Sequence, residues 1–216
     1  MKEYYDARAR EYDDWYLGTG LHAERRRPGW PDELHRLCAA VAALPPRRTL
    51  DVACGTGFLG RHLRGRLTGL DQSAGMLAIA RGRIPDGSFV QGDAFDLPFG
   101  DNAFQRLFTG HFYGHLEPPE RRRVLAEAQR VAAELVVVDS AMRPAADMPG
   151  EPLEHYSSAA DPGQAERMQQ RELRDGSRHV VYKRYFTAER LAHELRGEVL
   201  FAGDYFLMVR ASLRPE

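Results

Sequence analysis

The feature that most constrains the fold is an alternation of short apolar segments with helical segments between residues 31 and 140. This order predicts a parallel sheet with helices covering both faces. Strands are expected at 49–53, 66–71, 88–93, 103–110 and 134–140. Helices are expected at 31–44, 58–63, 73–83 and 118–132, with Ser73 capping the third.

The pattern changes after residue 140. Four prolines (Pro144, Pro149, Pro152 and Pro162) predict an irregular excursion over 141–165. A hairpin is expected around Asp175-Gly176, a helix at 187–195, and two strands within 198–212 joined at Gly203-Asp204. We therefore expect one α/β domain over 1–216 with a Rossmann-like, seven-stranded, mostly parallel sheet that ends in an antiparallel C-terminal hairpin. An N-terminal helical lid (1–45) and a substrate-cap insertion (141–186) would complete it.

Charge and composition exclude several classes of function. The net charge of −1 gives no reason to expect a polyanionic partner, and the arginine runs at 25–27 and 121–123 are expected to be solvated faces. Two cysteines, Cys38 and Cys54, form neither a disulfide framework nor a metal cluster. The start of the chain is polar and no apolar run approaches the ~20 residues of a membrane span. We expect a cytoplasmic protein that uses no metal, nucleic acid or membrane; its oligomeric state stays open.

A glycine-rich loop follows the first expected strand. The stretch "LDVACGTGFLG" (50–60) matches G-x-G-x-x-G, the fingerprint of dinucleotide-binding folds. Taken alone, the match would indicate an NAD(P)-dependent oxidoreductase. The flanking residues must therefore decide what the loop holds.

Three acids lie at the ends of the first three strands and indicate a different ligand. Asp51 near the loop would oppose a pyrophosphate but would favour an ammonium group. Asp71 suits a ribose diol, and Asp93 can accept from an exocyclic amine such as that of adenine. S-adenosylmethionine has these three parts and no phosphate.

With these residues in register, the sequence resembles the class I S-adenosylmethionine-dependent methyltransferases. The segments that carry the resemblance are "LDVACGTG" (50–57), "LTGLDQSAGML" (67–77), "FVQGDAFDLPF" (89–99) and "NAFQRLFTGHFYGHL" (102–116). The resemblance implies transfer of a methyl group from S-adenosyl-L-methionine to a small-molecule acceptor. No Asn-Pro-Pro-Tyr or Pro-Cys motif of DNA methyltransferases follows the fourth strand. Two alternatives stay open: the oxidoreductase, and a non-catalytic protein that binds S-adenosylmethionine or S-adenosylhomocysteine.

The resemblance also implies a set of cofactor-binding residues. Gly55 and Gly57 would let the backbone approach the methionine part, whereas Gly60 would only allow close helix–strand packing. The full set is Tyr5, Tyr12, Asp51, Ala53, Gly55, Thr56, Gly57, Asp71, Gln72, Met76, Asp93, Ala94, Thr109 and Gly110.

The segment "TGHFYGHLEP" after the fourth strand supplies the candidates for catalysis. His111 is the first choice for a general base, because imidazole titrates near neutral pH, and Tyr113 is the second. His115 either joins them or packs against a backbone group. Near the N-terminus, Tyr5, Tyr12 and Tyr16 would share a helix face, either as a lid over the cofactor or as a packing stripe.

Overall fold

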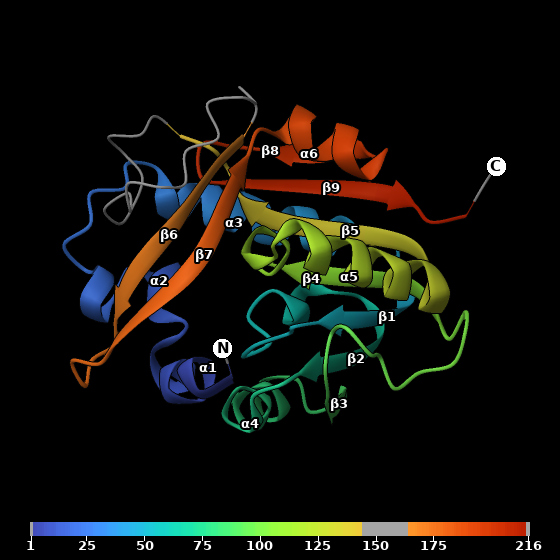
Figure 1. The fold of residues 1–216 in the computed structure, drawn as a ribbon, viewed down its shortest axis with the longest axis horizontal. Helices are drawn as coiled ribbons and strands as arrows, with labels where there is room; N and C mark the ends of the chain where they lie inside the picture. Colours follow the sequence, from blue (N-terminus) through green and yellow to red (C-terminus); the bar gives the residue numbers. More distant parts are fainter. Residues whose placement is uncertain (1, 144–163, 215–216) are drawn as a thin grey trace.

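A seven-stranded sheet forms the centre of the molecule (Figure 1). The computed structural model describes residues 2–143 and 164–214. Strand order is β3-β2-β1-β4-β5-β9-β8, and only β9 and β8 run antiparallel to their neighbours. The strands are β1 (Arg47–Val52), β2 (Gly65–Asp71), β3 (Ser88–Gln91), β4 (Phe104–Gly110), β5 (Ala132–Ser140), β6 (Gln164–Glu172), β7 (Arg178–Phe186), β8 (Glu198–Ala202) and β9 (Phe206–Ser212). The expected fold class is confirmed.

Helices cover both faces of this sheet. One buried cluster packs α5 and α6 against the sheet, and another packs α3 on the opposite face. The helices are α1 (Lys2–Arg8), α2 (Asp14–Leu17), α3 (Trp30–Ala43), α4 (Ala74–Arg83), α5 (Pro118–Val131) and α6 (Ala188–Leu195). Ser73 and Thr187 cap α4 and α6 as expected, each accepting a backbone N–H three residues later. None of the described helices is long and apolar enough to cross a membrane.

Two expectations about helices were wrong. The glycine loop leads only into a 3-10 turn, η3 (Gly60–His62), where a helix over 58–63 was expected. The N-terminal tyrosines do not share one helix, because α1, the 3-10 turn η1 (Ala9–Glu11) and α2 are separate short pieces. Gly18 ends α2 in the left-handed conformation (φ 67°).

The β6–β7 hairpin forms a separate two-stranded sheet and runs across the N-terminal segment (Figure 1). Its Leu173 and Val181 pack with Tyr4 of α1 in a small buried cluster. The hairpin therefore packs on the N-terminal segment that was expected to form the lid. The four prolines, and with them the centre of the expected cap, lie outside the described residues.

Candidate functional site: two joined pockets at the carboxyl ends of the strands

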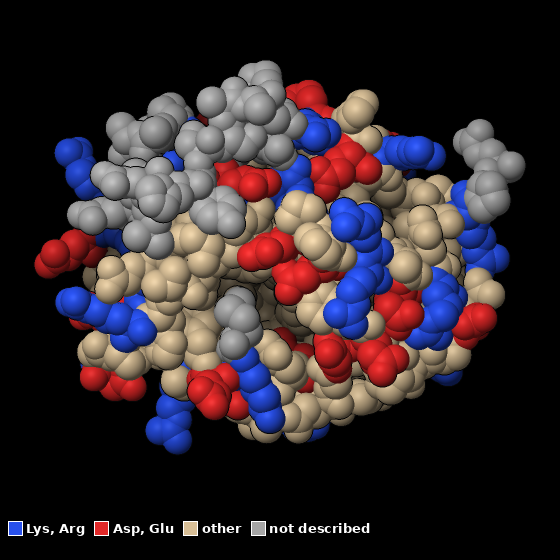
Figure 2. Space-filling model, in the orientation of Figure 1, with Lys and Arg blue, Asp and Glu red and all other residues tan. Residues whose placement is uncertain are grey.

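A narrow pocket opens where β1, β2 and β4 end. Its volume is about 140 Å³, and its walls include Ala53 and Gly55 after β1, Asp71 at the end of β2, and Gly110 at the end of β4. Ligands of open α/β sheets bind at this edge. Figure 2 shows a hollow near the centre of this face, between the positions that α1 and α5 occupy in Figure 1.

Two of the four described non-glycine residues with a positive φ lie at the same edge. Ala53 and His111, which follow β1 and β4, have φ angles of 55° and 56°, in the left-handed region that residues with a Cβ rarely adopt. Both residues line the narrow pocket. Strain of this kind is found preferentially at functional sites, where the surrounding structure holds it.

Asp71 binds the glycine loop and faces the narrow pocket. Its two carboxylate oxygens accept hydrogen bonds from the backbone N–H groups of Gly55 and Ser73, each at 2.9 Å. Burial raises the pKa of Asp71, and these two bonds oppose that rise. A carboxylate oxygen accepts more than one hydrogen bond, so Asp71 keeps capacity for a diol.

Eleven of the expected cofactor and catalytic residues line the narrow pocket. They are Tyr5, Tyr12, Ala53, Gly55, Asp71, Gln72, Met76, Asp93, Ala94, Gly110 and His111. Asp93 also accepts the N–H of Phe95 at 2.9 Å, so it acts as a turn residue as well.

Four expected cofactor-binding residues do not line the described pockets. The φ of Gly57 is 72°, but a Cβ there would point at Ile84 and Ala80 of the α4 side. Thr56 is bound by Asp13, and Thr109 donates to the Val52 carbonyl at 2.8 Å. Asp51 is buried, and its pKa is raised well above the usual value by burial and by Asp71.

Gly60 has a role that was not expected. A Cβ at this position would lie 2.5 Å from the Oδ2 atom of Asp51. The residue is therefore small because a buried carboxyl group occupies the space beside it, rather than because a helix packs on a strand there.

Tyr113 is the catalytic candidate that the structure moves away from the site. Its side chain is buried, and its hydroxyl donates to Glu194 of α6 at 2.7 Å. It lines neither described pocket. The expected catalytic role does not fit this position, because the 3-10 turn η4 (Tyr113–His115) directs the ring into the core.

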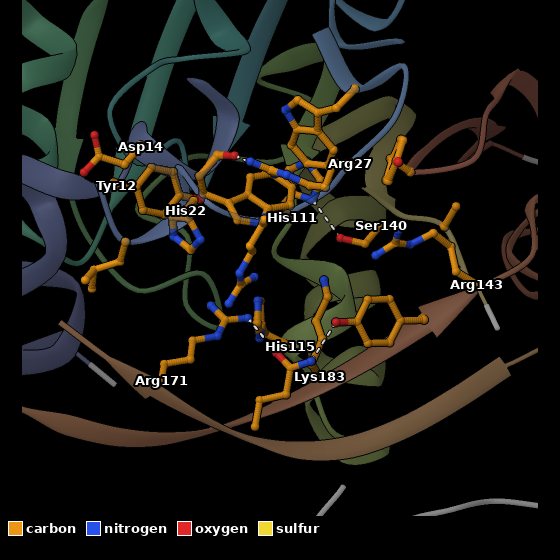
Figure 3. A pocket seen from close by; sticks show the side chains of 18 of the residues that line it. Tyr12, Asp14, His22, Arg27, His111, His115, Ser140, Arg143, Arg171 and Lys183 are labelled. Carbon is orange, nitrogen blue, oxygen red and sulfur yellow. Dashed lines mark hydrogen bonds between the residues drawn. The ribbon is translucent and has the colours of Figure 1, made fainter. Parts of the chain in front are cut away.

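A second, wide cavity of about 1150 Å³ adjoins the narrow pocket. Its walls come from the N-terminal segment, the carboxyl ends of β4 and β5, and the β6–β7 hairpin (Figure 3). Four residues line both spaces: Tyr5, Tyr12, His111 and His115. The two spaces therefore meet at two tyrosines and two histidines.

Both histidines at this junction are neutral. Burial lowers the pKa of His111 to about 3, and its Nδ1 atom lies 3.4 Å from Ser140 Oγ. Burial also lowers the pKa of His115 well below its usual value. The Nδ1 atom of His115 donates to the Tyr182 carbonyl at 2.7 Å, so its Nε2 atom carries the lone pair. The position of the proton-accepting nitrogen is thus fixed in His115 but not in His111, although the sequence predicted His111 as the general base.

The N-terminal tyrosines divide between the two roles that the sequence left open. Tyr5 and Tyr12 line the pockets, as a lid requires. Tyr16 is buried and stacks on Phe58 with ring centroids 4.0 Å apart, as a packing residue does.

Polar contacts of Asp13, which the sequence did not reveal, hold the N-terminal segment on the glycine loop. We call Asp13, Thr56 and Arg83 the Asp13 latch. Asp13 accepts from Thr56 Oγ1 at 2.6 Å and pairs with Arg83 of α4. Arg83 also donates to the Thr56 carbonyl and hydroxyl, both at 2.9 Å. The partners are 43 and 70 residues from Asp13, a separation at which no local pattern could have indicated them.

The fold is an open α/β sheet with a pocket at the carboxyl ends of its parallel strands, and comparison with known proteins narrows the class. A family model described as a methyltransferase domain matches residues 49–134. The demethylmenaquinone methyltransferase of Thermotoga maritima is 35% identical over 134 residues, which cover 59% of this chain and 54% of that protein. A dTDP-3-amino-3,6-dideoxy-alpha-D-glucopyranose N,N-dimethyltransferase of Streptomyces fradiae is 43% identical over 98 residues, which cover 39% and 38% of the two chains. The chain thus spans about half or less of these curated relatives.

A solved structure extends the likeness to nearly the whole chain. The DhpI-SAM-HEP complex has a TM-score of 0.67 and 26% identity, and the match covers 99% of this chain and 95% of that one. The chain is thus similar to S-adenosylmethionine-dependent methyltransferases, in sequence over residues 49–134 and in fold over nearly its whole length.

The residues of the narrow pocket fit S-adenosylmethionine. Three carboxyl groups line it, those of Asp71, Asp93 and Glu120, and no lysine or arginine does so among the described residues. A site without cations suits a ligand that carries an ammonium and a sulfonium, and it opposes the pyrophosphate of a dinucleotide. Met76 and the aromatic rings add the apolar surface that an adenosine needs.

Proposed function

We propose that the protein transfers a methyl group from S-adenosylmethionine to a small molecule. When bound, S-adenosylmethionine supplies an electrophilic methyl group on a sulfonium. The observation that carries the proposal is the junction at Tyr5, Tyr12, His111 and His115, which joins an anionic, partly apolar pocket to a cavity large enough for an organic acceptor. Cofactor and acceptor would meet across this junction.

The chain's own residues contribute binding and orientation. Asp71 would hold the ribose, Asp93 and Ala94 the adenine, and the tyrosines would cover the methionine end. The pocket would exclude water from the reacting atoms once the lid is closed. The four expected residues that line neither pocket would shape the glycine loop and the strand ends rather than contact the cofactor. They are Asp51, Thr56, Gly57 and Thr109.

The lid and cap are part of the same proposal. Residues 2–45 would close over the cofactor, and the β6–β7 part of the expected cap would cover the acceptor. The packing of Leu173 and Val181 on Tyr4 supports this arrangement, because it joins the two covers.

A general base is needed only when the molecule that receives the methyl group loses a proton in the reaction. His115 is the better-placed candidate, since its Nε2 lone pair is fixed by the bond from Nδ1. His111 would orient the acceptor, because its 3.4 Å contact from Nδ1 to Ser140 Oγ does not fix which ring nitrogen carries the lone pair.

Calorimetry and turnover test the proposal together. S-adenosylmethionine and S-adenosylhomocysteine should bind, and NAD should not. Formation of S-adenosylhomocysteine in the presence of candidate acceptors should then identify the activity. Binding of NAD with turnover of a hydride donor would overturn the proposal, and cofactor binding without turnover across a broad acceptor panel would favour the non-catalytic binding protein.

A further inference from the structure

The wide cavity is unusually rich in arginine. Its walls include six arginines and Lys183 against four acidic residues. The arginines are Arg8, Arg25, Arg26, Arg27, Arg143 and Arg171. Figure 3 labels three of the arginines, Arg27, Arg143 and Arg171. The run at 25–27 was expected to be a solvated face, and Arg25 and Arg26 are exposed. The loop after α2 also places all three arginines in the wall of a cavity that the distant hairpin completes.

Most of the acidic residues in the wall are bound to arginines that lie outside it. Glu11 and Asp14 both bind Arg174 of the hairpin turn, and Glu172 pairs with Arg178. Neither Arg174 nor Arg178 lines the cavity. Two positive charges outside the cavity thus offset part of the three negative charges of these residues.

Lys183 is compensated as well, because it donates to the buried Asp139 at 2.5 Å. The excess positive charge of the cavity thus belongs to its arginines. Within the described residues, Arg8, Arg25, Arg26, Arg27 and Arg171 form no ion pair with a carboxylate.

Arg171 occupies the central place in this group. It extends from β6 toward His115, one of the residues at the junction of the two spaces (Figure 3). Its guanidinium donates to neutral groups, the Gln169 amide oxygen at 3.2 Å and the Tyr4 hydroxyl at 3.5 Å. A guanidinium has five N–H donors in a fork that matches an oxyanion, so Arg171 has donors to spare.

The arginines repel one another in the absence of an anion. The pKa of Arg25 is lowered by burial and by Arg171, and the pKa of Arg27 falls to about 10 through burial and Arg25. Gathering like charges on a concave wall costs free energy that a bound anion would recover.

We infer that the methyl acceptor carries an oxyanionic group, a phosphate, a phosphonate or a carboxylate, which Arg171 and Arg25 hold in the wide cavity. The inference deepens the proposed function and rests on it. The narrow pocket has the opposite character, with three acids and no described arginine or lysine. The two spaces would thereby sort a cationic donor from an anionic acceptor by charge.

The test measures binding of simple anions to the complex of the full chain with S-adenosylhomocysteine. Inorganic phosphate, methylphosphonate and acetate are titrated separately by calorimetry, and methyl acetate serves as a neutral probe. At least one anion should bind and methyl acetate should not. The anion that binds most tightly assigns the oxyanion class.

Variants then locate the site. Arg171→Met and Arg25→Met should each weaken anion binding about tenfold or more, as expected when a charged hydrogen-bond partner is lost. Arg66→Met is the control, since Arg66 is an exposed arginine at the start of β2 that lines neither pocket, and it should bind as the wild type does. Because Arg25 lies in a loop at the wall of the cavity and outside the buried core clusters, its variant keeps the test valid if Arg171→Met fails to fold.

The outcomes separate the two proposals. Failure of S-adenosylhomocysteine to bind would count against the proposed function. Binding of S-adenosylhomocysteine with no anion bound, with methyl acetate bound equally well, or with unchanged anion affinity in folded Arg171→Met and Arg25→Met would overturn this inference alone.

Discussion

Lys183 Nζ lies 2.5 Å from Asp139 Oδ1, and both side chains are buried. The Asp139 carboxylate also accepts the N–H groups of Gly114 and Ser140, each at 2.7 Å. The pair joins β7 to β5 directly behind His111, whose Nδ1 atom is 4.0 Å from Asp139. It therefore anchors the outer hairpin to the central sheet at the junction of the two pockets.

Asp139→Asn should destabilise the protein by about 3–5 kcal/mol, because it leaves the Lys183 ammonium buried without its counter-charge. Chemical denaturation of the two proteins would measure the difference. Asp139→Asn combined with Lys183→Met should recover much of the loss. Equal stability of wild type and Asp139→Asn would show that Lys183 finds water or another partner.

Asp71→Asn should weaken binding of S-adenosylmethionine by about 1.5–3 kcal/mol, the range for hydrogen bonds to a charged group. An amide cannot accept at both ends, so one of the Gly55 and Ser73 N–H bonds is also lost, and some stability with it. Calorimetry with the cofactor gives the affinity. Asp86→Asn, an exposed acid outside both pockets, is the control and should bind normally.

Asp13→Ala should loosen the N-terminal segment, because Asp13 holds both Thr56 and Arg83. Hydrogen exchange over residues 2–17 should speed up in the variant without cofactor, and cofactor should restore part of the protection. Asp32→Ala, at an exposed site in α3, is the comparison. Strong and equal protection in Asp13→Ala and wild type would mean that aromatic packing alone holds the segment.

Acid should destabilise the protein through His111. Its pKa is about 3 in the folded protein against an ordinary value of 6.5, so between these limits the unfolded chain binds a proton that the folded one does not. The free energy of unfolding should therefore decrease as the pH falls, by about 1.4 kcal/mol per pH unit from this residue. His111→Gln should reduce the measured slope between roughly pH 6 and 4. An unchanged slope would place the ring in contact with water.

The two histidines should respond differently to substitution if the acceptor loses a proton. His115→Gln should lower turnover by about 10²–10⁴ at saturating cofactor, whereas His111→Gln should retain most of it. Cofactor affinity, measured in parallel, should stay close to wild type in both. The opposite order would restore His111 as the base, and near-normal turnover in both variants would indicate that the protein supplies no base.

The sequence predicted the sheet because its signals are local: apolar runs, glycine turns, and the caps Ser73 and Thr187. It also predicted the residues at strand ends, since parallel strands bring their carboxyl ends to one edge. It could not place Tyr113, because one 3-10 turn decides whether that ring faces the core or the pocket. It could not reveal the contacts of Asp13 with Thr56 and Arg83 or the place of Arg25 in the cavity wall, because their surroundings come from segments far along the chain.

The arrangement of β6 and β7 has an evolutionary consequence. The hairpin pairs only with itself in the described structure, apart from a single bridge between Phe186 and Ala141, and it supplies Arg171 and Lys183 to the cavity. The donor side of the site is built into the main sheet, where a change disturbs the core. If the hairpin covers the acceptor as proposed, selection could exchange one acceptor for another by altering the hairpin while the half of the site in the main sheet is inherited unchanged.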